Sequence, residues 1–127
     1  MRRVVIDMQN RLFADAIRQA LTSFDSDFDP QSAERPELTE ELCRLLRPYA
    51  LIMEVTSYKP WSLEERLQLR EKIKAVVPEC KIVLLVDENT EKGLADRVRQ
   101  TKKDGLIDQF IYGSVSATYL SAVIDAL

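Results

Sequence analysis

The chain contains no histidine, only two cysteines and only three glycines among its 127 residues. Without histidine it lacks the side chain that most often acts as a general base, and both Ser–His and Cys–His nucleophile pairs are excluded. Cys43 and Cys80 do not form a Cys-x-x-Cys pair, so no zinc site is expected. We expect two buried, reduced thiols, no cofactor and no enzymatic activity.

Long apolar runs and an excess of basic charge are also missing. No run approaches the roughly 20 residues that span a bilayer, and Asp7 comes too early for a secretory signal. The 21 acidic residues outnumber the 18 basic ones, for a net charge of −3. A surface that binds nucleic acid needs a clustered basic field, so we expect no direct nucleic-acid binding and no membrane contact. A cytoplasmic location follows as the expectation.

The residues present alternate between two apolar patterns. Short apolar runs typical of strands covered on both faces lie at Val4–Ile6, Ala50–Val55, Lys81–Val86 and Leu106–Tyr112. A further strand is expected within Phe24–Ala33, where the pattern does not fix its limits. Helical patterns separate these runs, so we predict an α/β fold with a doubly wound, five-stranded parallel sheet flanked by five helices. The whole chain, 1–127, is expected to form one domain.

Five helices are predicted from apolar spacing and from end signals. Their ranges are Arg11–Phe24, Glu37–Leu46, Pro60–Val77, Thr90–Lys103 and Ser116 to the end. Asn10 is expected to cap the first helix, Ser62 to cap the third, and Gly105 to end the fourth. Leu12 is assigned to the inward face of the first helix, and Leu45 to that of the second.

Five residues fall where predicted strands end: Asp7, Met8, Glu54, Val86 and Tyr112. In parallel sheets such ends meet at one edge, where ligands bind at the switch in strand order. With this order and spacing, the chain resembles the receiver domain of bacterial two-component response regulators, a flavodoxin-like fold. The resemblance covers essentially the whole chain. Its best stretch, Arg3–Leu21, looks like the opening of receivers that precede helix-turn-helix output domains.

The resemblance implies a site for phosphorylation at these strand ends, and the sequence departs from it at most positions. In the family, paired acids and a phosphoacceptor Asp hold Mg²⁺, while a Ser or Thr and a Lys contact the phosphoryl group. Here Asp7 matches the first acid, Met8 replaces the second, and Glu54 stands at the phosphoacceptor position. Val86 replaces the hydroxyl and Tyr112 the lysine. Asp7 and Glu54 remain as candidate Mg²⁺ ligands, although a thioether is a poor neighbour for a hard cation.

These departures favour a degenerate pseudo-receiver that works in signal transduction or transcription regulation through protein contacts, independently of phosphorylation. Glu54 could mimic the phosphorylated state in part, because a carboxylate carries one charge and a phosphate nearly two. One alternative is an active phosphoacceptor that uses Mg²⁺ with Asp7 and Glu54. Another is a sensor whose vacated pocket, lined by Met8, Val86 and Tyr112, binds a small organic ligand.

Two surfaces are candidates for partner binding. In the last helix, Tyr119, Val123 and Leu127 recur at a spacing of four, so they could form the interface of a homodimer or remain part of the core. Leu120, Ala122 and Ile124 would then face the sheet. The loop of Tyr58–Trp61 could present its Trp to a partner, although packing is the preferred reading. The expected partner is another protein or an output domain that follows Leu127.

Overall fold

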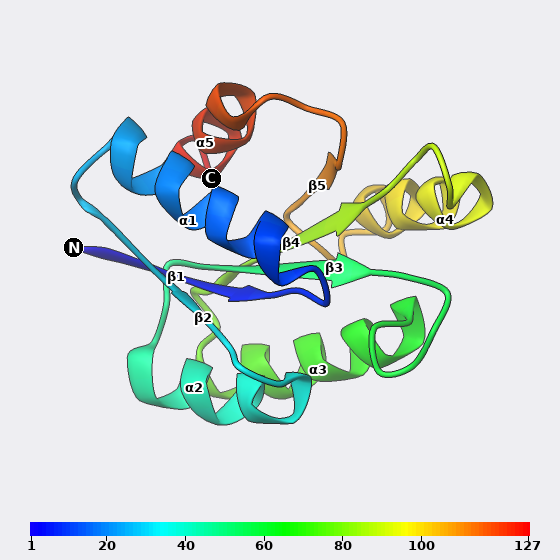
Figure 1. Cartoon of the computed structure of the whole chain (residues 1–127). Coiled ribbons are helices and arrows are strands. Elements are labelled where there is room, and N and C mark those ends of the chain that lie inside the picture. Colours follow the sequence, from blue (N-terminus) through cyan, green and yellow to red (C-terminus); the bar gives the residue numbers. More distant parts are fainter.

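The computed structural model describes all residues, 1–127, as strands and helices that alternate along the chain (Figure 1). One 3-10 turn, η1, precedes the second helix. None of the helices combines the length and the apolar character that crossing a membrane requires. In chain order the elements are β1 (Arg2–Asp7), α1 (Arg11–Phe24), β2 (Phe28–Ser32), η1 (Pro36–Leu38), α2 (Thr39–Leu46), β3 (Ala50–Val55), α3 (Leu63–Val76), β4 (Lys81–Val86), α4 (Lys92–Lys103), β5 (Gln109–Tyr112) and α5 (Ala117–Asp125).

All five strands form one parallel sheet in the order β2-β1-β3-β4-β5. The chain moves from β1 to one neighbour, β2, and then crosses to the other side to add β3, β4 and β5. Helices α1 and α5 cover one face, and α2, α3 and α4 cover the other (Figure 1). The predicted doubly wound, flavodoxin-like fold is confirmed.

Alternation along β1 divides its side chains between the two helical layers. Val4 and Ile6 pack with α1 and α5, whereas Val5 packs with α2, α3 and α4. The same alternation directs Asp7 toward the α2–α3 layer and Met8 toward α1. This division decides which partners each residue of the candidate site meets.

Helix α1 has the predicted bounds, while α3 begins at Leu63, three residues later than predicted, and α4 begins at Lys92, two residues later than predicted. The predicted end signals nevertheless act at the helix ends. The Asn10 side chain accepts a hydrogen bond from the Phe13 N–H at 3.0 Å, and Ser62 accepts one from Glu65 at 3.3 Å. Each side chain satisfies a first-turn N–H that has no partner inside the helix. Gly105 follows α4 with φ of 77°, a left-handed conformation that glycine adopts without a steric penalty. These local predictions are confirmed.

Other predictions needed correction. Leu12 is 83% exposed and Leu45 is 77% exposed, so neither faces the core. In each helix a different residue sets the buried face: Ala14 in α1 and Cys43 in α2. Leu12 and Leu45 each lie two positions from these residues, about 200° around the helix, so they point to solvent. The helix predicted from Glu37 begins as a 3-10 turn and becomes α-helical at Thr39.

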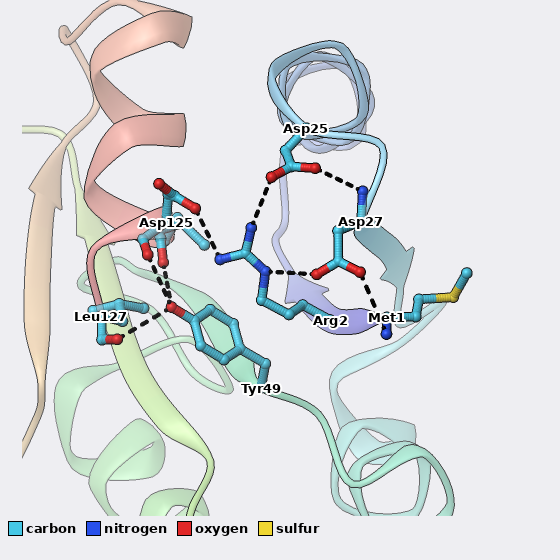
Figure 2. Close-up of polar contacts among 8 residues, drawn as sticks. Met1, Arg2, Asp25, Asp27, Tyr49, Asp125 and Leu127 are labelled. Atoms are coloured by element: carbon cyan, nitrogen blue, oxygen red, sulfur yellow. Dashed lines mark hydrogen bonds and ion pairs between the residues drawn. The ribbon is translucent and has the colours of Figure 1, made fainter.

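At the amino-terminal edge of the sheet, an ionic cluster joins three elements (Figure 2). The guanidinium of Arg2 contacts carboxylate oxygens of Asp25 at 3.2 Å, Asp27 at 3.0 Å and Asp125 at 2.9 Å. The guanidinium carbon also lies 4.0 Å from the centroid of the Phe28 ring, a cation–π distance. The start of β1 is thereby tied to the α1–β2 loop and to the end of α5. We call this set the Arg2 clamp.

The Tyr49 hydroxyl, just before β3, reinforces the end of α5 beside the Arg2 clamp. Its oxygen lies 2.8 Å from the carbonyl oxygen of Ile124 and 3.2 Å from that of Leu127 (Figure 2). Ile124 lies in the last turn of α5, where no i+4 donor reaches the carbonyl oxygens, and Leu127 is the residue that follows this end of the helix. The hydroxyl donates its single proton among them and fixes the carboxyl end of the helix.

Candidate functional site

The carboxyl ends of β1, β3, β4 and β5 meet at one edge of the sheet, because all four strands run in parallel. Asp7 pairs with Met53 across β1 and β3, and Val86 lies between Val55 and Tyr112. The switch in strand order falls between β1 and β3, where ligands bind in folds of this kind. The sequence therefore predicted correctly which edge of the sheet holds these strand ends.

Asp7 is buried at this edge with 2% of its side chain exposed, and its partners are protein groups. One carboxylate oxygen, Oδ2, accepts hydrogen bonds from Arg66 Nη1 and from Thr39 Oγ1, each at 2.7 Å. The other, Oδ1, accepts a hydrogen bond from Arg66 Nη2 at 3.2 Å. Arg66 comes from α3 and Thr39 opens α2, so these two helices are fixed to the end of β1.

Arg66 is itself buried, with 1% of its side chain exposed. Beyond the carboxylate, its Nη2 donates to the backbone oxygen of Asp7 at 3.0 Å, and its Nε donates to the backbone oxygen of Glu54 at 2.8 Å. Each of the three guanidinium nitrogens therefore has an oxygen partner. A buried ion pair offsets its desolvation cost only when its hydrogen bonds are satisfied in this way.

Glu54 meets a different set of partners from Asp7. Its Oε1 accepts hydrogen bonds from the backbone N–H groups of Gln9 at 2.7 Å and Asn10 at 3.2 Å. In β3, Ile52 packs in the α1–α5 layer and Met53 in the other, so alternation directs Glu54 toward α1. The Asp7 and Glu54 side chains thus leave the sheet on opposite faces. The structure does not bring the two carboxylates together around one ion.

Of the three remaining predicted residues, Val86 and Tyr112 are neighbours on β4 and β5, and Met8 lies apart from both. Val86 is fully buried in the α2–α3–α4 layer. Met8 lines a small recess of about 90 Å³ near α1, together with Arg11, Asp15 and Ser32 among others. Tyr112 lines a recess of about 420 Å³ between β5 and α5. Met8 and Tyr112 therefore border two different recesses, and the common pocket expected for a small ligand is not formed by these three residues.

These contacts decide whether the residues fit the Mg²⁺ ion that the receiver resemblance implies. Asp7 is committed to Arg66 and Thr39, Glu54 lies on the other face, and Met8 offers only a thioether. No group of three or more His, Cys, Asp or Glu side chains is placed to hold a metal ion. Mg²⁺ prefers several oxygen ligands in near-octahedral geometry. The residues present do not fit the ion.

Sequence reasoning missed Arg66 and Thr39, the two partners of Asp7. A signal for Arg66 was present: it lies three residues after Leu63 and seven before Ile73, so the three share one face of α3. Both neighbours are buried, which places the arginine on the inward face. Thr39 is fully buried as well, at the first position of α2.

The loop between β3 and α3 borders the same edge of the sheet. Tyr58 is exposed, whereas the Trp61 ring is half-buried and its indole nitrogen lies beneath the surface without a hydrogen-bond acceptor. The hydroxyl of Ser57 donates to the Glu91 carboxylate at 2.6 Å and so joins this loop to the start of α4. Trp61 therefore serves the packing of the loop, and Tyr58 is the aromatic residue that faces solvent.

The predicted interface residues of α5 divide into two kinds. Tyr119 is 57% exposed and borders the recess between β5 and α5. Val123 and Leu127 are half-buried against the α1–α5 layer of the core. Ala122, which was expected to face the sheet, is exposed, and Ser121 is buried instead beside Leu120 and Ile124. The core-facing side of α5 therefore holds Leu120 and Ile124 as expected, with Ser121 in place of Ala122, and Tyr119 points outward.

Both cysteines lie in the α2–α3–α4 layer as buried free thiols, as expected. Burial in apolar surroundings raises the pKa of Cys43 to about 12 and that of Cys80 to about 12. At neutral pH both thiols are protonated, and a protonated thiol is neither a nucleophile nor a metal ligand. Neither cysteine contributes chemistry to the site.

Comparison with known proteins adds the fold. No protein-family model matches the chain, and no curated protein matches it. Among solved structures, a response regulator from Thermotoga maritima matches with a TM-score of 0.78 at 18% identity, over 99% of this chain and 96% of that one. An orphan response regulator of H. pylori matches with a TM-score of 0.72 at 19% identity, over 98% of this chain and 94% of that one.

A third solved structure shows the chemistry that this fold can carry. It is a response regulator from Burkholderia pseudomallei with a phosphorylated aspartic acid and a calcium ion. It matches with a TM-score of 0.72 at 14% identity, over 98% of this chain and 66% of that one. At such identities the likeness shows the fold. The chain has the fold of response-regulator receiver domains, as its sequence resemblance implied.

Proposed function

We propose that this chain, which has the receiver fold, is a pseudo-receiver domain that regulates signalling or transcription through protein contacts and without phosphorylation. It would act as a regulator and not as an enzyme. A cytoplasmic location is part of the proposal, since both cysteines are free thiols, the form in which cytosolic cysteines are kept.

The observation that carries the proposal is the state of Asp7, the acid retained from the family's pair. Its carboxylate is buried and has accepted three hydrogen bonds from Arg66 and Thr39. A carboxylate with its lone pairs engaged in this way is a poor ligand for an added cation, because binding would first require breaking the buried ion pair. Phosphoryl transfer in receivers depends on that cation, so its loss removes the support for phosphorylation.

The other strand-end residues support the same proposal. Val86 has no hydroxyl with which to follow a phosphoryl group, and Tyr112 brings no positive charge. Glu54 holds its carboxylate against two backbone N–H groups of the β1–α1 loop. That loop would therefore keep one arrangement permanently, which agrees with a domain that has a single, constitutive state.

The proposed contact surface is the recess of about 420 Å³ between β5 and α5. It is lined mainly by apolar and aromatic side chains, with Phe110 and Tyr112 in edge-to-face contact at 5.5 Å between ring centroids. Tyr119 stands exposed beside it. An exposed aromatic residue at the rim of an apolar recess is a common anchor for a protein partner. A second copy of the chain, an output domain or another protein would bind here.

Phosphodonor labelling tests the central claim. The intact protein is incubated with acetyl phosphate and Mg²⁺, and its mass is followed beside an intact receiver as positive control. The expected result is no change in mass for this chain. A stoichiometric adduct of about 80 Da that disappears in Glu54→Gln would overturn the proposal and favour the active phosphoacceptor.

Sedimentation tests whether the β5–α5 face joins two copies. The expected result is a wild-type dimer at high micromolar concentration whose amount does not change with phosphodonor, and a monomer for Tyr119→Glu. Because Tyr119 is largely exposed, this variant should stay folded. Exposed Leu12 on α1 supplies a control, since Leu12→Glu should leave the dimer intact. A wild-type monomer would refute the homodimer and leave the face to another partner.

A further inference from the structure

The oxygen atoms around Arg66 resemble the ligand set of a hard cation. Its guanidinium contacts both carboxylate oxygens of Asp7, the backbone oxygen of Asp7 and the backbone oxygen of Glu54, at 2.7–3.2 Å. All four ligands are oxygen atoms, and they belong to the ends of β1 and β3, on either side of the switch in strand order. Carboxylate and carbonyl oxygens are also the ligands that Mg²⁺ and Ca²⁺ prefer.

The charge at this point is balanced by Arg66 alone. One guanidinium opposes one buried carboxylate, and Thr39 completes the hydrogen bonding of Asp7 with a neutral hydroxyl at 2.7 Å. A divalent ion added beside them would leave an uncompensated excess of positive charge in a buried site, which is strongly unfavourable. Arg66 and a metal ion are therefore alternatives for the same carboxylate.

A route from solvent to this point exists along one side of the arginine. Arg66 borders an open recess of about 320 Å³ between the η1–α2 segment and α3. Glu37, Glu40 and Glu65 line the same recess. Shortening the Arg66 side chain would connect the oxygens of Asp7 with this recess. Its three glutamates would then outnumber its one remaining cation, Lys72, so the lining would attract cations.

From this arrangement we infer that Arg66 is a tethered cation that takes the place of the dissociable metal ion and holds the strand ends together without it. The inference rests on the proposed function, because it explains how a receiver fold keeps one state in the absence of metal and phosphate. Its consequence is specific to this chain. Removing the guanidinium should create a cation-binding site where the intact protein has none.

The experiment measures thermal unfolding of Arg66→Ala with MgCl₂, CaCl₂ or methylguanidinium added, against matched ionic strength. The variant is expected to be destabilised and then to regain stability in a saturable way, by about 5 °C at ten times the dissociation constant. Wild type should show no such response. Asp7→Asn placed in the same variant should abolish the response, since the carboxylate is its main ligand.

Arg70→Ala is the matched control. Arg70 lies one turn further along α3 and donates to the backbone oxygen of Leu106, away from Asp7. Its loss should cause destabilisation without any response to cations. If Arg66→Ala stays unfolded alone, its refolding yield replaces the melting temperature. Recovery with any of the three cations supports the inference, and no recovery with any of them overturns it.

The two proposals fail separately. Phosphodonor labelling of wild type would overturn the proposed function, whatever the cation response of Arg66→Ala. A folded Arg66→Ala that ignores all three cations would overturn only the tethered cation, since unlabelled wild type would still be a receiver that works without phosphate.

Discussion

Two arginines contact aspartates at opposite edges of the same sheet, and their surroundings differ sharply. Arg66 and Asp7 are 1% and 2% exposed, whereas the Arg2 side chain is 24% exposed and its partners more so. Arg66 serves a single carboxylate, while Arg2 is shared among three. Both sites pair a guanidinium with aspartate, and they differ in the number of partners and in their access to water.

That difference determines what each arginine does for the fold. Water screens the charges of the Arg2 clamp, so each of its ion pairs contributes little to stability. When one ion pair is lost, the remaining charged groups are still solvated. The Asp7 side chain is only 2% exposed, so removing Arg66 would leave a buried charge without a partner. The buried pair therefore fixes one arrangement of the strand ends, while the exposed cluster adds a graded amount of stability.

Replacing each arginine with methionine is the most direct test of whether the two sites differ in their contribution to stability. Arg66→Met should lower the free energy of unfolding by about 3–5 kcal/mol, because Asp7 is left charged and buried. Arg2→Met should lose about 1–2 kcal/mol, from exposed ion pairs and a cation–π contact. Urea denaturation of the three proteins measures both values. Equal losses would contradict the distinction between the two sites.

Two double-mutant cycles should measure the difference between the Arg66 and Arg2 sites more directly. Adding Asp7→Asn to Arg66→Met removes the stranded charge and should restore about 2 kcal/mol of the loss. Adding Asp125→Asn to Arg2→Met should change the stability by less than about 0.5 kcal/mol, since Asp125 is already solvated. Urea titrations of each double variant and of its two single variants give the coupling energy of each pair. A coupling at Arg2 as large as that at Arg66 would be evidence against the comparison.

The effect of salt on stability should also differ between the two sites, by a smaller amount. The Debye length falls to about 3 Å in 1 M salt, which screens exposed charges and leaves buried ones largely unaffected. The loss in melting temperature that Arg2→Met causes should therefore shrink by roughly half between 0.05 and 1 M NaCl. The deficit of Arg66→Met should stay constant over that range, as measured by melting temperature relative to wild type at each salt concentration.

The smallest expected effect concerns acid. The hydrogen bond from the N-terminal amine, together with Arg2, holds the pKa of Asp27 below its usual value. Because the folded pKa is the lower one, Asp27 stabilises the fold above its unfolded pKa, and this contribution disappears as the pH falls through the folded value. Asp27→Asn should thus melt slightly below wild type at pH 6, and the difference should shrink as the pH falls below the ordinary aspartate pKa of about 3.9. A constant difference across this range would exclude the linkage.

The sequence predicted those features that depend on neighbours along the chain. Helix starts at Asn10 and Ser62 follow from a side-chain oxygen three residues before the N–H that it accepts, and strand runs follow from local apolarity. The partner of Asp7 depends on tertiary packing, since Arg66 is 59 positions away. Arginine is also among the residues least often buried, so an outward orientation was the default. The residues at the strand ends were predictable, but Arg66 and Thr39, the partners of Asp7, were not.

The two leucines that were misplaced show a second limit. Leu12 and Leu45 lie in helices with apolar residues on more than one side, so periodicity alone allows more than one inward face. Packing chose the faces that hold Ala14 and Cys43, because small side chains allow α1 and α2 to approach the sheet closely. The choice depends on fit between layers, which a single helical pattern does not contain.

The anchoring of α5 by Tyr49 and Arg2 has a mechanical consequence. The helix is held at its last turn, while its first turn and Tyr119 lie near the opposite edge of the sheet, where β5 ends. An element held at one end moves as a lever. Nine residues at 1.5 Å each give an arm of about 13 Å, so a tilt of 10° would displace the first turn by about 2 Å. The partner proposed to bind at Tyr119 would therefore push on the end of α5 that lies far from the Arg2 clamp.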